Sequence, residues 1–383
     1  MTAYDALVLG VGGVGSAALA ELALRGVRVL GVDRFEPGHD RGSSHGDTRL
    51  IRLAYCEHPD YVPLLRRAYE HWEGWQAASP VELFRPSGVL EAGPSDSPLV
   101  SGVRRAAAEH DLILEELSAG AARVRFPGLR LPDDYDVLVE PHGGVLRVEN
   151  AVRSRVAAAL AAGAELRAGV EVLAWEVTPS GVRVRLSGEG LPAGGEIVEA
   201  ARLVLTPGAW APDLLSDVGV PFEVVRKVLL WCPTRSAVYT PSAGFLPFAV
   251  QHPDGEFVYG FPELEPGRLK LAEHTGGAPV VDPLTVERRC LEADTARVAA
   301  FAEAHLPDVE PAPCAHTVCL YTRTPDEHFA LGAHPASDRV VFAAGLSGHG
   351  YKFAPVLGEA LADLVLDGGT AQPVGFLAPQ RFA

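Results

Sequence analysis

The hydrophobic pattern of the first 33 residues predicts a strand, a tight turn, a helix and a second strand. Two short apolar runs, at 6–9 and 27–32, flank a segment rich in alanine and leucine. Three glycines in G-x-G-x-x-G spacing separate the first run from that segment, namely Gly10, Gly12 and Gly15. The pattern predicts a βαβ unit whose helix begins directly behind the glycines.

Each part of this unit has a role in binding a dinucleotide. Gly10 permits the tight turn, Gly12 lets a pyrophosphate approach the backbone, and Gly15 lets the helix pack on the strands. Asp33 ends the second apolar run, where a carboxylate can accept hydrogen bonds from a ribose. The motif does not separate FAD from NAD, but Asp33 argues against NADP because it would repel the 2′-phosphate.

Helical periodicity or composition recurs in five later segments, which are 60–78, 98–110, 149–162, 286–305 and 352–366. Strand patterns lie between them, at 88–92, 169–177, 182–186, 201–206, 223–231, 245–250, 256–261, 268–274 and 339–344. The strand at 201–206 meets Pro207, Gly208, Ala209 and Trp210, and a glycine at such a strand end is a common ligand position. We expect one nucleotide-binding domain built from three separated pieces, with a second domain of antiparallel strands inserted twice.

Composition narrows the choice of partners. A length of 383 residues fits two or three domains, and the net charge of −16 argues against nucleic acid or an anionic membrane as a partner. The five cysteines lack metal-site spacing, so we expect no metal site, no disulfide framework and a reducing compartment. No run of 18 apolar residues occurs, and we expect a cytoplasmic protein.

The loop after Asp33 carries candidate ligand contacts. Ser43 and Ser44 are small and polar, and Arg49 and Arg52 are three residues apart. If a helix begins at Thr48, both arginines point to one side and suit an anionic group. The alternative is a pair of solvated surface arginines, and spacing alone does not decide between them.

Three longer motifs together resemble the family of monomeric sarcosine oxidases and N-methyltryptophan oxidases, which also contains pipecolate oxidases. They are GSSHGDTRLIR at 42–52, CAHTVCLYTRTPDEHF at 314–329 and GLSGHGYKF at 345–353. The resemblance implies an α/β fold with a Rossmann-like FAD-binding domain and a substrate domain whose sheet is mostly antiparallel. We assign 1–80, 145–221 and 322–383 to the first domain, and 81–144 and 222–321 to the second.

The resemblance also implies the activity. Family members oxidise a secondary amino acid to an imine that hydrolyses, and they reduce O₂ to H₂O₂. We expect a sarcosine-like N-methyl amino acid as the substrate, with N-methyltryptophan, pipecolate or another bulky or cyclic amino acid as the alternative. An NAD-dependent dehydrogenase and a non-catalytic FAD-binding subunit are more remote alternatives. We expect a monomer.

The resemblance makes Cys319 the attachment point of a covalent flavin, whereas a lone cysteine is otherwise more often a small core residue. It places Arg49 near the flavin ring. The loop 345–350 and the start of the helix after it would favour negative charge on the flavin. The expected cofactor contacts are Gly10, Gly12, Gly13, Gly15, Asp33, Arg34, Ser43, Ser44, Arg49, Cys319, Gly345, Ser347, Gly348 and Lys352.

For the substrate, the resemblance implies that Arg52 and Lys352 hold the carboxylate. It implies that Lys270 promotes the reaction with O₂ and that His274 faces the amine. Without the resemblance, both lysines would be interpreted as solvated. The expected catalytic set is completed by Arg49, Tyr259, Tyr321 and His349. Cys56 and the region 240–250 depart from the family pattern. The sequence therefore does not specify which side chain the amino acid substrate carries.

Overall fold

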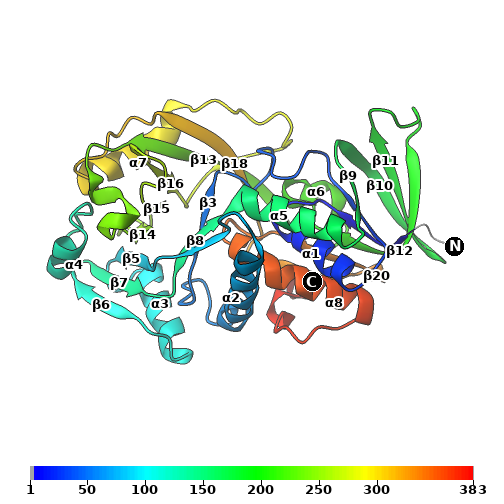
Figure 1. Cartoon of the computed structure of the whole chain (residues 1–383), viewed down its shortest axis with the longest axis horizontal. Coiled ribbons are helices and arrows are strands. Elements are labelled where there is room, and N and C mark those ends of the chain that lie inside the picture. The colour runs from blue at the N-terminus through cyan, green and yellow to red at the C-terminus, as the bar shows by residue number, and fades with distance from the viewer. Residues whose placement is uncertain (1–3, 383) are drawn as a thin grey trace.

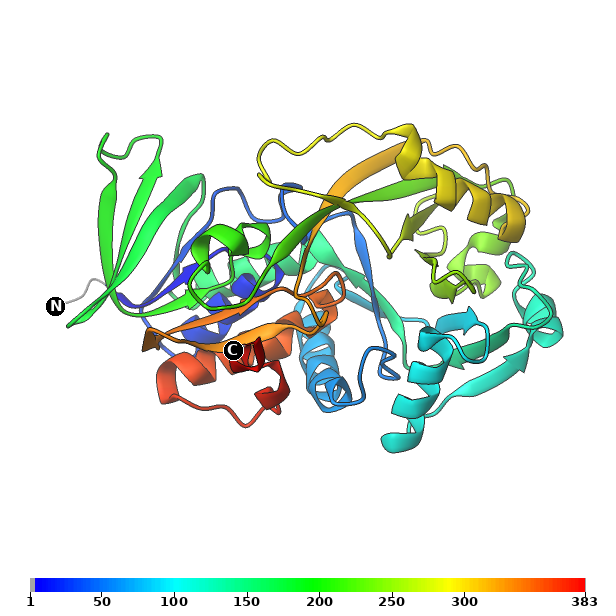
Figure 2. The same ribbon diagram turned by 180° about the vertical axis from the view of Figure 1, so that it is seen from behind.

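The computed structural model describes residues 4–382, which form an α/β protein with two large sheets and one small sheet (Figures 1 and 2). The first large sheet has eight strands in the order β10-β11-β12-β1-β2-β9, with β20 paired to β12 and β19 paired to β20. Its strands are β1 (Tyr4–Leu9), β2 (Val29–Val32), β9 (Glu165–Arg167), β10 (Val170–Thr178), β11 (Gly181–Gly188), β12 (Glu196–Leu205), β19 (Ala330–His334) and β20 (Ser337–Ala344).

The centre of this sheet is the predicted βαβ unit. Strand β1 runs parallel to both β2 and β12, and its side chains enter hydrophobic cores on both faces of the sheet. Burial on both faces is typical of a parallel sheet covered by helices. Helix α1 (Gly13–Leu24) packs between α5 (Val148–Ala161) and α8 (Ala354–Asp367). The N-terminal, middle and C-terminal parts of the chain therefore meet around one sheet, as Figure 1 shows.

The second large sheet has nine strands in the order β17-β13-β16-β15-β14-β5-β7-β6, with β18 paired to the other edge of β13. All pairs except β5–β14 are antiparallel, which confirms the mostly antiparallel sheet. The strands are β5 (Val89–Gly93), β6 (Glu115–Ser118), β7 (Asp136–Glu140), β13 (Glu223–Pro233), β14 (Phe248–Gln251), β15 (Phe257–Gly260), β16 (Arg268–Glu273), β17 (Ala278–Pro279) and β18 (Ala315–Arg323).

The two faces of this sheet have different surroundings. Leu230 and its alternate neighbours on β13 pack in a core with Phe301 of α7 (Glu292–His305). Leu229 belongs to a separate core on the opposite face, together with Cys319 and Tyr321 of β18. This opposite face contacts the first part of the chain, because the hydroxyl of Ser43 donates a hydrogen bond to the Leu320 carbonyl. We call it the inner face of the nine-stranded sheet.

The small sheet corrects the helix expected at Thr48. Residues Thr48–Ile51 form strand β3, which pairs with β8 (Gly144–Arg147), and β8 also pairs with β4 (Phe84–Pro86). The backbone of Gly46 and Asp47 has positive φ values of 84° and 67°. A right-handed helix does not accommodate these values, and the turn leads into an extended strand instead. The two arginines at 49 and 52 therefore do not share a helix face.

The other predicted helices are confirmed with small shifts. Helix α2 covers Tyr61–Ala78, α3 covers Pro98–Glu109, and α7 begins six residues later than expected. The pattern did not predict the strands β4, β6, β7, β8, β9, β17, β18 and β19, nor the short helices α4 (Ala119–Arg125) and α6 (Ala211–Leu214). The domain boundaries stay a prediction. Within residues 4–382, none of the helices combines the length and the apolar character needed to cross a bilayer.

Candidate active site

A cavity of about 400 Å³ opens where β1 and β12 end, and we call it the nucleotide cavity. Twelve of the fourteen expected cofactor contacts line it, namely Gly10, Gly12, Gly13, Gly15, Asp33, Arg34, Ser43, Ser44, Arg49, Gly345, Ser347 and Gly348. Cys319 and Lys352 do not line it. Pro207, Gly208, Ala209 and Trp210, which follow β12, also belong to its wall, as expected for a ligand position at a strand end.

The glycine turn is shaped to admit a phosphate group. Gly10 has a φ of 86°, and a Cβ on Gly15 would lie 1.8 Å from the Gly10 carbonyl oxygen, so the helix approaches the turn as only glycine permits. Helix α1 begins at Gly13 with Gly12 as its N-cap, which has no side chain to cap the helix. The Gly13 amide donates to the Ser44 hydroxyl at 3.0 Å, and the rest of the first turn presents the positive end of the helix to an anion.

The far end of the nucleotide cavity suits a ribose and an adenine ring. The Asp33 carboxylate accepts hydrogen bonds from the Val11 amide at 2.6 Å and the Phe35 amide at 2.9 Å, which hold it beside the glycine turn. Arg34 forms an ion pair with Glu171 and lies 5.5 Å from the centre of the Trp210 ring. Glycine turn, acid and flat side chains together fit FAD, the cofactor that the sequence motifs imply.

A second cavity, of about 50 Å³, adjoins the first, and we call it the substrate cavity. The two share the wall residues Arg49, Tyr321, Gly348 and Tyr351. Seven of the eight expected catalytic residues line the substrate cavity, namely Arg49, Arg52, Tyr259, His274, Tyr321, His349 and Lys352. Sequence reasoning missed Leu50, Glu57, Phe257 and Tyr351 in its wall. Leu50 and Phe257 follow an ordinary strand pattern that gives no sign of a ligand.

Two buried cations line the substrate cavity. Arg52 is only 4% exposed, and its Nε lies 2.7 Å from Oε1 of Glu91. The Nζ of Lys352 donates to the His349 carbonyl at 2.9 Å. Burial and then the nearby Arg52 charge lower the pKa of Lys352 to about 7. Arg52 also lies 3.5 Å from the carboxylate of Glu57, whose pKa it lowers against the opposing effect of burial.

Lys352 lies in the 3₁₀ helix η4 (Tyr351–Phe353), two residues before the start of α8, and therefore does not open α8 itself. The indole N–H of Trp72 in α2 donates to the Lys352 carbonyl at 2.8 Å. Trp72 is fully buried, so this bond fixes the backbone from which the lysine side chain extends. The tryptophan thus has a structural role behind the site.

Two histidines in the wall are neutral near pH 7. Burial lowers the pKa of His274 to about 3 and that of His349 to about 4. His349 is held on both sides of its ring, by the Tyr55 hydroxyl at 2.5 Å and by the Glu327 carbonyl at 2.9 Å. His274 has ring contacts with Phe257 at 5.1 Å and with Tyr321 at 5.6 Å. A neutral imidazole can donate one hydrogen bond and accept another without adding charge to the cavity.

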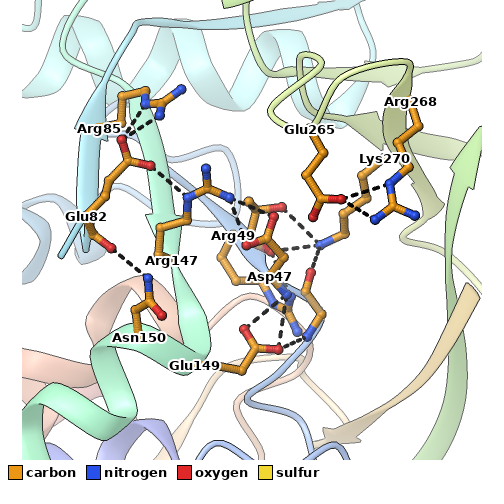
Figure 3. Close-up of polar contacts among 12 residues, drawn as sticks. Asp47, Arg49, Glu82, Arg85, Arg147, Glu149, Asn150, Glu265, Arg268 and Lys270 are labelled. Atoms are coloured by element: carbon orange, nitrogen blue, oxygen red, sulfur yellow. Dashed lines mark hydrogen bonds and ion pairs between the residues drawn. The ribbon is translucent and has the colours of Figure 1, made fainter. Parts of the chain in front are cut away.

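Lys270 lines neither cavity. Its side chain extends from β16 on the inner face, and its Nζ donates to the carbonyls of Gly46 at 2.6 Å and Thr48 at 2.9 Å (Figure 3). Arg49 lies next to Lys270 and these two carbonyls, and it lines both cavities. Burial and then the Arg49 charge lower the pKa of Lys270 well below its usual value.

The turn that receives Lys270 is held from its other side by charged groups. Arg147 donates two hydrogen bonds to the Asp47 carboxylate, at 2.7 and 2.8 Å. The carboxylate of Glu149, in the first turn of α5, accepts from the backbone amides of Gly46 and Asp47 (Figure 3). These contacts offset the strained backbone of Asp47 and fix the carbonyls that bind the lysine.

Cys319 lies in the middle of β18, with its side chain on the inner face. Its sulfur is 3.5 Å from Nη2 of Arg49 and 3.6 Å from the Ser43 carbonyl oxygen. Both of those residues line the nucleotide cavity, so the thiol lies directly behind its wall.

Comparison with known proteins agrees with this geometry. The chain matches the FAD dependent oxidoreductase family over residues 5–364. It is 41% identical to a monomeric sarcosine oxidase of Streptomyces avermitilis, covering 99% of this chain and 98% of that protein. It is 36% identical to an N-methyl-L-tryptophan oxidase of Salmonella arizonae, covering 95% of each.

Among solved structures, the open form of a Tyr258Phe mutant of NikD, described as an unusual amino acid oxidase, aligns with a TM-score of 0.86. That alignment covers 99% of this chain and 98% of the other, at 26% identity. Because the matched family consists of FAD enzymes, the alternative of an NAD-dependent dehydrogenase is excluded. The chain belongs to the FAD dependent oxidoreductases, in the group of monomeric sarcosine oxidases and N-methyltryptophan oxidases.

Proposed function

We propose that this protein oxidises a small secondary amino acid of the sarcosine type to an imine, which hydrolyses, and passes the electrons to O₂ to form H₂O₂. The observation that carries this proposal is the buried pair Arg52 and Lys352 in a cavity that adjoins the nucleotide cavity. Two cations without access to bulk water suit a carboxylate that must be held in one orientation. The names of the relatives support the same substrate class.

The size of the substrate cavity favours sarcosine over N-methyltryptophan. A cavity of about 50 Å³ has room for roughly three to five waters, since each needs about 10–15 Å³. That room matches the few heavy atoms of an N-methyl glycine better than an indole side chain. Phe257, half-buried against His274, limits the space near the imidazole.

The residues of the chain would act mainly by binding and orientation. With the carboxylate on Arg52 and Lys352, the amine would point toward His274 and the rings of Tyr259 and Tyr321. These rings exclude water, and neutral His274 can accept a hydrogen bond from the amine without repelling it. Bound FAD supplies the acceptor for the hydride equivalent. The nitrogen reacts as the neutral amine, so no side chain has to act as a strong base.

We propose that the flavin is attached covalently through Cys319. The thiol lies behind the wall of the nucleotide cavity, and Arg49 Nη2 at 3.5 Å would stabilise a thiolate during attachment. After acid precipitation, we expect the yellow colour to stay with the wild-type pellet and to leave it in Cys319→Ser. A colourless wild-type pellet under a yellow supernatant would remove the tether and keep FAD.

The function is tested by a peroxide-coupled assay with sarcosine, pipecolate and N-methyltryptophan. We expect the highest kcat/KM for sarcosine, with one H₂O₂ formed for each aldehyde that hydrolysis of the imine releases. Sarcosine amide is the matched control, because it keeps the amine and lacks the carboxylate. A higher kcat/KM for N-methyltryptophan would favour the bulky-substrate alternative, and no peroxide from any secondary amino acid would overturn the proposal.

The proposal extends to the domain division, the oligomeric state and the location of the protein. We propose that residues 1–80, 145–221 and 322–383 form the FAD-binding domain, and that 81–144 and 222–321 form the substrate domain. The position of the substrate cavity between β3, β15 and η4 supports this division. We further propose a monomer, because several relatives are named monomeric sarcosine oxidases, and a cytoplasmic location.

A further inference from the structure

Glu91 is a buried carboxyl beside the substrate cavity, with no part in binding or orienting the amine. It lies in β5 on the inner face, between Ala249 of β14 and Leu138 of β7, and it is 1% exposed. Its Oε1 lies 2.7 Å from Nε of Arg52, but the N–H is not aligned for a hydrogen bond. Among residues 4–382, neither oxygen of Glu91 has a hydrogen-bond partner.

The charges around Glu91 do not balance. Arg52 and Lys352 are the cations that act on it, from the segment after β3 and from η4. Two other carboxyls act on the same group, namely Glu57 and Glu140 of β7. The imidazole of His349, which also faces this cluster, is neutral near pH 7 because burial lowers its pKa to about 4. Three carboxyls therefore share the charge of Arg52 and a lysine whose pKa is lowered to about 7.

The other two carboxyls have polar partners that Glu91 lacks. Glu140 accepts hydrogen bonds from the Leu53 and Ala54 amides, each at 2.7 Å. Glu57 accepts one from the Cys56 thiol at 3.0 Å and lies in the cavity wall. A carboxylate without hydrogen bonds is the costliest of the three to keep ionised in a buried site. Burial accordingly raises the pKa of Glu91 to about 8, although the nearby Arg52 opposes the shift.

The position of Glu91 leaves part of Arg52 available to a ligand. Glu91 lies against Nε, and Nη2 contacts the Cys56 sulfur at 3.3 Å and the Glu57 carboxylate at 3.5 Å. Above about pH 8, where Glu91 is ionised, a carboxylate that binds the Nη edge brings a fourth negative charge to the cluster. The cheapest way to restore the balance is to protonate the carboxyl that has no hydrogen bonds.

We propose that Glu91 is a positioning residue that holds the Nε edge of Arg52 and takes up a proton from solvent when a carboxylate binds. The step converts one carboxylate and one proton to a carboxylic acid, with no redox change. The inference rests on the proposed carboxylate site. It implies that carboxylate affinity falls as the pH rises above about 8, where free Glu91 becomes ionised.

The test uses the holoenzyme with acetate, which binds as a carboxylate and cannot be oxidised as an amine. Titration calorimetry at about pH 9 in two buffers of different ionisation enthalpy gives the number of protons taken up. We expect Glu91→Gln to lower this number by about one relative to wild type and to flatten the pH dependence of the acetate Kd. Any uptake at Lys352 persists in the variant, so the difference isolates Glu91.

Glu256→Gln is the matched control. Glu256 also has a buried oxygen without a partner and a pKa raised by burial, but it does not line the substrate cavity. It should keep the wild-type proton uptake. Infrared difference spectra of wild type at about pH 9, with and without acetate, provide a test that needs no variant. A new carbonyl stretch of a protonated carboxylic acid should appear with acetate and not with acetamide.

Each result has a definite meaning. Unchanged proton uptake in Glu91→Gln, or no carboxylic acid band in wild type, would overturn the inference and leave the proposed function in place. If wild type binds no acetate at any pH, the carboxylate site itself fails, and the inference fails with it. If the protein binds acetate with proton uptake but forms no peroxide, the inference holds and the proposed oxidase activity fails.

Discussion

Replacing Lys270 with methionine should slow the reaction of the reduced enzyme with O₂ by about 100- to 1000-fold, the usual effect of removing one fixed charge-stabilising group from a buried site. The first electron given to O₂ makes superoxide, whose negative charge a nearby ammonium stabilises. Lys270 is 4% exposed and bound to the carbonyls of Gly46 and Thr48. Its charge therefore keeps a fixed position. Anaerobic reduction by substrate should change far less than reoxidation.

Stopped-flow mixing of substrate-reduced enzyme with O₂ measures this effect. Lys227→Met is the matched control, because Lys227 is also a buried lysine on the inner face of the sheet, where its Nζ donates to the Thr275 carbonyl. It should keep a rate near that of wild type. Equal losses in both variants would indicate general damage to the sheet, and an unchanged rate in Lys270→Met would contradict the assignment.

The same charge predicts a pH dependence with a definite sign. Burial and then Arg49 lower the pKa of Lys270, so the ammonium form prevails below that pKa and is lost as the pH rises through it. The rate constant for O₂ should fall with rising pH in wild type. In Lys270→Met this dependence should disappear.

The sequence predicted the nucleotide half of the site well because its determinants are local. Gly10, Gly12, Gly15 and Asp33 lie within one βαβ unit, where strand, turn and helix are set by neighbouring residues. All four line the nucleotide cavity. The loops around Ser43 and Gly345 line the same cavity, but their place there was predicted only from the family resemblance. Nothing in the spacing of their own residues specifies which strand ends they lie beside.

The substrate half of the site was harder to predict, because it depends on contacts between strands that are far apart in the sequence. Glu91 lies beside Arg52 only because β5 pairs with β14 and β7, and strand pairing of this kind has no local signal. The helix expected at Thr48 failed for a related reason, since pairing with β8 and the turn at Asp47 decide the conformation. Tertiary context overrides a local spacing argument in such short segments.

Removing the Arg52 side chain should raise the KM for sarcosine by about 30-fold or more, which corresponds to about 2 kcal/mol or more for a truncated buried charge pair. The guanidinium is 4% exposed, so water cannot replace it. We expect kcat to fall less than KM rises. Steady-state kinetics with sarcosine and with sarcosine amide measure the effect, and the amide should show little change because it brings no carboxylate.

The choice of variant matters because Arg52 also neutralises Glu57 and Glu91. Arg52→Ala leaves both carboxyls without their nearest cation, and part of its effect would come from that loss. Combining Arg52→Met with Glu57→Gln and Glu91→Gln removes both stranded charges along with the cation. If the KM for sarcosine stays high in this triple variant, the lost affinity belongs to the guanidinium itself. Arg52→Lys keeps the charge but loses the planar fork, and we expect an intermediate KM. A KM at the wild-type value in Arg52→Ala would place the carboxylate site elsewhere.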